Sequence, residues 1–176
     1  MGRDERQLKK RVRAVQSITD PYAKVSAVTD LVKEWWVGLG EDRVCELVAD
    51  AERAAWSITS EKVRTSALAH LAVVVSSAGM WYNRYHRAES IAENIALSIT
   101  REDVKSSTLA ELAIEDQARS VGLSDRANRI ARSIPIESTR AQTLAKIEKL
   151  VRDREAEWEE RKRLEVIDPS WGSAYD

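Results

Sequence analysis

The chain has 176 residues, of which 28 are Lys or Arg and 29 are Asp or Glu, so its formal net charge is −1. Proteins that bind DNA or RNA neutralise phosphates and usually carry a basic excess, so this balance argues against a nucleic acid as the main partner. The single Cys45 excludes an internal disulfide and is typical of proteins from a reducing compartment.

The chain shows no signal for secretion or membrane insertion. Residues 1–6 are mostly charged and lack the apolar core of a signal peptide. The longest apolar run, 71–75, is much shorter than the roughly 20 residues that span a bilayer. We expect a cytoplasmic protein with no membrane partner.

Composition favours helix throughout, because glycine and proline are few and Ala, Leu, Arg and Glu are frequent. No segment keeps the strict alternation of a half-buried strand. We predict an all-α fold of about eight helices. In chain order they cover 3–18, 21–37, 41–58, 60–78, 83–99, 101–120, 123–134 and 137–165.

A Ser-Ile pair occurs four times, and its copies begin 35 to 41 residues apart. The pairs are Ser17-Ile18, Ser57-Ile58, Ser98-Ile99 and Ser133-Ile134. The residues that follow align without a gap. Eleven positions after each serine stands an aliphatic residue: Val28, Leu68, Leu109 and Leu144. The last three pairs are preceded by an Ala-x-x-x-Ala step.

We interpret each repeat as two antiparallel helices, helix A after a Ser-Ile pair and helix B before the next pair. Hydroxyl groups that can cap helix A follow three pairs, at Thr19, Thr59 and Thr100. In the first repeat Asp20 and Pro21 form a second start signal. Glycines that can close helix A follow at Gly40, Gly79 and Gly122.

The apolar face of helix A is wider than one neighbouring helix can cover. Each hairpin therefore needs the next one to bury its remaining apolar surface. We expect a right-handed α-solenoid of about four antiparallel hairpins over 1–150. A charged extension of the last helix would follow over 151–167, and a short flexible tail over 168–176.

One pattern is clearest in segments 92–112 and 127–147. It reads A-x-x-I-A-x-S-I, followed by a base four residues before Leu-Ala. This pattern resembles the degenerate tetratricopeptide-like helical repeats of bacterial proteins. The resemblance implies a scaffold for protein–protein interaction, often the adaptor or sensor portion of a larger assembly.

A basic residue stands seven positions after each serine. The four are Lys24, Arg64, Lys105 and Arg140. One interpretation is a ladder that holds an acidic peptide or phosphates. The other is structural, because each base lies four residues before a core aliphatic and can bury its stem. In the structural interpretation Glu52 and Glu93 would pair with Arg64 and Lys105.

Aromatic residues gather at the two first A-to-B turns. They are Trp35, Trp36, Trp81, Tyr82 and Tyr85. Large rings with a polar tip are frequent at the energetic centres of interfaces, so these residues are candidate partner contacts. The alternative is that they pack inside the longer turns. Trp56 adjoins a recurring alanine, and we expect it to pack between repeats.

The sequence contains no recognisable catalytic or metal-binding motif. His70 shares its repeat position with Asp30, Glu111 and Lys146, which indicates a solvated position. His86 and Cys45 show no ligand spacing, so we expect no metal and no cofactor. Neither a nucleophile elbow nor a phosphate-binding loop is present, and we expect no enzyme.

The last helix departs from the repeat after 150 and becomes densely charged. It could cap the stack with a polar face, or protrude and pair with a second copy as a short coiled coil. Three functions therefore remain open: an adaptor that binds a protein or peptide, a self-assembling structural protein, and a regulatory subunit of a separately encoded enzyme.

Overall fold

The computed structural model describes residues 3–79, 86–119 and 124–167, and every regular element in these ranges is an α-helix. The helices are α1 (Arg3–Gln16), α2 (Pro21–Leu39), α3 (Glu41–Trp56), α4 (Glu61–Gly79), α5 (His86–Ser98), α6 (Glu102–Arg119), α7 (Asp125–Arg132) and α8 (Glu137–Ile167). Their number and order confirm the prediction, and each boundary lies within three residues of it.

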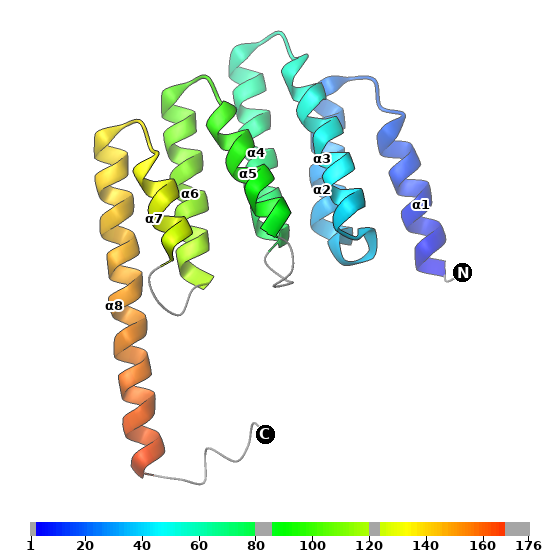
Figure 1. Ribbon diagram of the computed structural model, residues 1–176. Helices are drawn as coiled ribbons and strands as arrows, with labels where there is room; N and C mark the ends of the chain where they lie inside the picture. Colours follow the sequence, from blue (N-terminus) through cyan, green and yellow to red (C-terminus); the bar gives the residue numbers. More distant parts are fainter. Residues whose placement is uncertain (1–2, 80–85, 120–123, 168–176) are drawn as a thin grey trace.

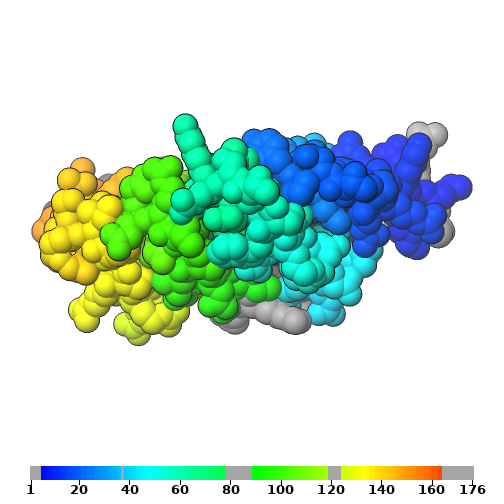
Figure 2. Space-filling view, turned by 90° about the horizontal axis from the view of Figure 1, so that it is seen from above, coloured from blue at the N-terminus to red at the C-terminus, as the bar shows by residue number. Residues whose placement is uncertain are grey.

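The helices form hairpins that stand side by side in two layers (Figure 1). Layer A consists of α2, α4, α6 and α8, each packed on the next. Layer B consists of α1, which packs on α2, and of α3, α5 and α7, each packed against the layer A helices that precede and follow it in the chain. Seen from above, the stack is elongated, with α1 at one end and α8 at the other (Figure 2). Packing between sequence neighbours is the arrangement predicted for stacked hairpins.

The four Ser-Ile pairs occupy equivalent places, at the turns from layer B to layer A. Each serine hydroxyl donates a 2.7 Å hydrogen bond to the carbonyl three residues earlier: Ser17 to Ala14, Ser57 to Ala54, Ser98 to Ile95 and Ser133 to Ile130. Each isoleucine N–H also donates to a carbonyl three residues earlier. These bonds satisfy groups that the end of a helix leaves without partners.

The start signals of the helices were predicted in part. Asp20 caps α2 by accepting a 2.7 Å bond from the Ala23 N–H, and Pro21 follows as the first helical residue. The capping role predicted for Thr100 is not what its hydroxyl does, because it bonds to Glu61 of the preceding hairpin at 3.0 Å. Thr100 therefore links two repeats.

The core lies between the layers. The recurring alanines of layer B are fully buried: Ala51, Ala55, Ala92, Ala96, Ala127 and Ala131. Small side chains at these positions let the layer A helices approach closely, and Leu68, Leu109 and Ile147 fill the space around them.

The end of α2 is bent at Trp35, whose backbone leaves helical geometry (φ −124°, ψ 17°). Gly40 alone joins α2 to α3, and its φ of +74° is a conformation that favours glycine. α2 thus ends at Gly40 as predicted, although the ψ of 157° differs from that of the left-handed helical conformation. Gly79 is the last residue of α4, and Gly122 lies outside the described residues.

The C-terminal end of the stack has a polar outer face. One position, fifteen residues after the serine, is fully buried in three repeats, as Val32, Ala72 and Ala113. In the last repeat it is the exposed Glu148. Four residues further on, Arg152 is exposed where Trp36, Ser76 and Gln117 are buried. The outward side of α8 is therefore built for contact with water.

At the N-terminal end, too, exposed polar residues replace residues that are buried in the inner repeats. Six residues before the serine, Ala51, Ala92 and Ala127 are fully buried, whereas α1 has the exposed Arg11 at this position. Gln7 is exposed where α3 has the buried Leu47. Both outer faces of the stack are therefore polar. Among the described helices, none has the length and apolar character needed to cross a membrane.

Candidate functional site

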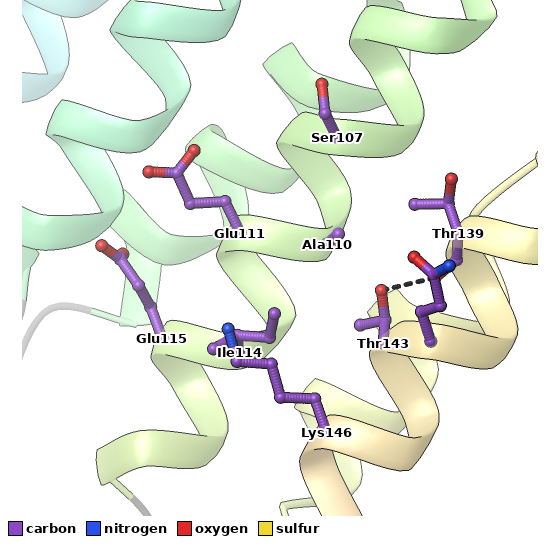
Figure 3. A pocket seen from close by; sticks show the side chains of 9 residues that line it. Ser107, Ala110, Glu111, Ile114, Glu115, Thr139, Thr143 and Lys146 are labelled. Carbon is purple, nitrogen blue, oxygen red and sulfur yellow. Dashed lines mark hydrogen bonds between the residues drawn. The ribbon is translucent and has the colours of Figure 1, made fainter.

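A hollow lies between α6 and α8, two consecutive layer A helices (Figure 3). Its volume is about 560 Å³. It is lined by Ser107, Ala110, Glu111, Ile114 and Glu115 from α6, and by Thr139, Gln142, Thr143 and Lys146 from α8. Ala110 and Ser107 are small, so the two helices leave room between them although they belong to adjacent hairpins.

The lining combines carboxylates with hydroxyl and amide groups over an apolar strip. Glu111 and Glu115 are one helical turn apart on α6, and their side chains point away from α8, toward the side of α4 (Figure 3). The Ser77 hydroxyl of α4 donates a hydrogen bond to the Glu115 carboxylate, whose two oxygens lie 3.1 and 3.3 Å from it, and this bond orients Glu115. Lys146 extends from α8 across Ile114 (Figure 3). A segment with a cation and N–H donors would find acceptors here.

The four bases predicted as a column are half-buried at the start of their layer A helices. Arg64 donates to the carbonyl of Ile58, and Arg140 to that of Ile134, each at 3.2 Å. These two arginines thus bind the ends of the preceding layer B helices. Lys24 and Lys105 have the same backbone placement, with N–H groups bonded to the carbonyls four residues earlier.

The predicted pairing of Glu93 with Lys105 is wrong. Glu93 lies 3.0 Å from Arg129 and 3.8 Å from Arg126 in the ion pairs of α5 with α7. Arg126 also contacts Asp116 at 2.7 Å and Glu89 at 3.2 Å. One arginine therefore joins carboxylates of two other helices, and this cluster fixes α7 against α5 and α6.

The aromatic candidates are separated by the structure. Trp36 is 4% exposed and packs in the core, out of reach of a partner. Trp35 is half-buried, and the Arg11 guanidinium lies 5.6 Å from the centre of its ring. Trp81, Tyr82 and Tyr85 lie outside the described residues.

Exposed apolar side chains occur instead at the opposite edge, near the Ser-Ile turns that face the viewer in Figure 2. They are Tyr22, Trp56, Val63 and Leu97. Trp56 contacts Arg64 of the next repeat, whose guanidinium lies 5.7 Å from the ring centre, but its ring is 41% exposed and only partly packed between repeats. A sequence signal existed, because Gln16 and Arg132 hold the position of Trp56 in other repeats.

A smaller hollow of about 420 Å³ lies at the N-terminal end, between α1, the end of α2 and the start of α3. Its lining includes Glu5, Lys9, Arg13 and Arg43 around the apolar Leu8. Gly38 approaches α1 closely, since a Cβ atom in its place would lie 3.3 Å from the Leu8 side chain. The hollow is bordered by a close backbone approach and mostly basic groups.

Among the described residues, no three His, Cys, Asp or Glu side chains are grouped as a metal site would need. His70 is exposed, as are Asp30, Glu111 and Lys146, which confirms that this repeat position is solvated. Cys45 is buried. The side chain of His86 lies outside the described part of the chain.

The fold defines a class, that of all-helical proteins built from stacked hairpins. Comparisons of the chain with models of protein families, with curated proteins and with solved structures gave no match.

Proposed function

We propose that this chain is a non-catalytic, cytoplasmic adaptor of the tetratricopeptide-like class, a right-handed α-solenoid that holds a segment of another protein in the hollow between α6 and α8. The observation that carries the proposal is the hollow itself. It is formed by equivalent positions of two successive repeats, and its lining offers hydrogen-bonding groups over an apolar strip. Binding over a face built from several repeats is how helical stacks hold extended partners.

The polar end faces favour an adaptor over a protein that assembles end to end. A further hairpin placed against α8 would bury Glu148 and Arg152, whose positions are buried in the inner repeats. Burial of unpaired charges costs several kcal/mol and would oppose such growth. Partner binding between the helices needs no such burial.

The partner segment we propose carries a lysine or arginine. Glu111 and Glu115 supply two carboxylates, and Lys146 is the one basic side chain in the lining. Glu115 is already oriented by Ser77, so a cation that reaches it meets a fixed acceptor. Ser107, Thr139 and Gln142 can bond to the backbone of the same segment.

Site-specific photo-crosslinking in the native cytoplasm tests the proposal. A benzophenone side chain at the exposed Gln142 should trap one discrete partner, and the same group at the exposed Asn94 of layer B should not. The trapped segment, identified by mass spectrometry, should contain Lys or Arg next to the crosslink.

A charge-reversal variant provides the second part of this experiment. Glu111→Lys should reduce trapping at least tenfold, whereas Glu148→Lys, at another exposed site on the C-terminal face, should leave it unchanged. Trapping that is insensitive to Glu111→Lys, or a trapped segment without a basic residue, would contradict the proposal.

A further inference from the structure

The hollow at the N-terminal end, between α1, the end of α2 and the start of α3, has an apolar floor. Its volume of about 420 Å³ lies within the range of roughly 300–1,000 Å³ that is usual for binding pockets. Leu8 and Val12 of α1 and Leu39 of α2 contribute apolar atoms to its lining. Leu8 is 9% and Val12 is 6% exposed, so these two side chains form the bottom of the hollow. An apolar side chain of a ligand would be removed from water there.

Three bases surround this floor, namely Lys9 and Arg13 on α1 and Arg43 on α3. Glu5 is the acid among the described lining residues, and it lies 3.0 Å from Lys9. Arg43 lies 2.5 Å from Glu46, so Lys9 and Arg43 both have an acidic partner within the chain. Arg13 forms no ion pair with any residue that the structure describes. It is therefore the base of the lining that is available to an anion.

The positive charge continues from Arg13 along the outer face of α1. Arg6, Lys10 and Arg13 are four and three residues apart, so their side chains share one face of the helix. This face is opposite the buried Leu8 and Val12, and we name its three bases the basic stripe. All three are exposed, and none forms an ion pair within the described part of the chain. In a chain with a net charge of −1, the basic stripe is a local attraction for anions.

We propose that this hollow and the basic stripe bind an acidic segment of a partner protein, a segment that also carries an apolar side chain. The apolar side chain enters the hollow, and carboxylates beside it pair with Arg13 and Lys10. Both contributions are needed, because exposed ion pairs alone contribute little and the burial of one side chain is offset by the cost of association.

An acidic peptide fits this surface better than a membrane or a nucleic acid does. Basic clusters that bind anionic membranes contain about four to eight bases. Proteins that bind DNA commonly contact about six to ten phosphates. The basic stripe has three bases, and the apolar floor beside it is recessed between helices, where a peptide side chain can enter.

This site is independent of the hollow between α6 and α8. The two lie at opposite ends of the stack, where Figure 2 shows α1 and α8, and they share no residue. Their charges also differ, since the first offers unpaired bases and the second offers carboxylates. The proposal for the N-terminal end therefore does not rest on the adaptor proposal.

NMR titration of the isotope-labelled chain with synthetic peptides tests the proposal. The probe is a peptide with a central tryptophan and two glutamates on either side. It should shift the amide signals of α1 and of residues 38–43, and its affinity should fall by at least about fivefold when glycine replaces the tryptophan. A peptide with lysines in place of the glutamates should leave these signals in place.

Charge-reversal variants separate the site from the net charge of the chain. Arg13→Glu should weaken binding of the acidic peptide by at least about tenfold, and Lys10→Glu by about threefold. Lys149→Glu changes the net charge equally at an exposed site on α8, and should alter the affinity by less than about twofold. Circular dichroism shows that each variant is folded.

Several results would overturn the proposal: no shift at the site with the acidic peptide, equal shifts with the lysine peptide, equal affinity of the glycine peptide, or equal weakening by Arg13→Glu and Lys149→Glu. Binding to phosphatidylserine vesicles that exceeds binding to the acidic peptide, and that Arg13→Glu abolishes, would assign the basic stripe to a membrane and would overturn it as well.

Discussion

Arg64 donates a 3.2 Å hydrogen bond to the backbone carbonyl of Ile58, the second residue of its Ser-Ile pair. Arg140 makes the same bond to Ile134 at the same distance. The accepting carbonyls lie just past the ends of layer B helices, where intrahelical partners are lacking. The arginine therefore joins the end of one layer to the beginning of the other.

Removing this bond should destabilise the stack. Arg64→Met keeps the apolar stem but leaves the Ile58 carbonyl without its donor and removes the cation over Trp56. We expect the free energy of unfolding in urea to fall by about 1–2 kcal/mol. Lys105→Met, at the equivalent position of the third repeat, should change it by less than about 0.5 kcal/mol. Equal losses in the two variants would show that the bond is not the cause.

The buried alanines of layer A should tolerate no charge. Ala113 is fully buried, and Ala113→Glu would place a carboxylate between hairpins without a partner. We expect a loss of more than about 3 kcal/mol in unfolding free energy, or a chain that does not fold. Ala145→Glu, on the exposed face of α8, should cost less than about 0.5 kcal/mol. Thermal unfolding followed by circular dichroism separates the two, and similar midpoints would contradict the assignment of inner and outer faces.

The arginine cluster offers a pair of variants that differ mainly in burial. The Arg126 side chain is 19% exposed and contacts Glu89, Glu93 and Asp116. Arg126→Gln leaves these carboxylates without that cation and should lower the unfolding free energy by about 2–3 kcal/mol. Arg129 is 66% exposed, and Arg129→Gln should cost less than about 1 kcal/mol. Chemical denaturation at neutral pH measures both, and a larger loss for Arg129→Gln would refute this ranking.

Asp103 gives a prediction that depends on pH. The hydrogen bond from Arg101, at 2.6 Å, holds the pKa of the Asp103 carboxyl below its ordinary value of 3.8. Since the folded pKa is the lower one, the stabilisation is present above the ordinary value and is lost as the pH falls through the folded pKa. Arg101→Gln should raise the pKa of Asp103 toward 3.8, as followed by carbon NMR of the carboxyl. Lys9→Gln, on α1, should leave the pKa of Asp103 in place, and an unchanged pKa in Arg101→Gln would rule out Arg101 as the cause.

The hairpins were predictable because their signals are local and repeated. Ser17 and its three equivalents each precede a turn, and Asp20 with Pro21 marks a helix start in the sequence itself. The polar ends of the stack were also readable, since Glu148 and Arg152 replace residues that are apolar or uncharged in the other repeats. Local signals and their recurrence along the chain are therefore sufficient for predicting the helices and their pairing.

The burial of individual side chains was harder to predict, because it depends on which side chains of the neighbouring repeat lie beside them. Trp36 is buried at a repeat position that is also buried in the next two repeats, as Ser76 and Gln117, and Trp56 is exposed because it stands at the edge of its hairpin. The hollow was missed although the repeat register contained it. Ser107 and Gln142 are equivalent positions, and so are Glu111 and Lys146, so stacking sets them opposite one another.

The serine bond that recurs at every B-to-A turn joins two residues of the same corner. Each corner is therefore closed in part within its own segment, while the bonds of Thr100 to Glu61 and of the Ile136 N–H to Ser106 add links to the preceding repeat. A gene that copied one repeat in frame would lengthen the scaffold by one hairpin while both water-facing ends stayed where they are. The number of hairpins in such a molecule can therefore change by duplication, because each added hairpin would use the same turn contacts.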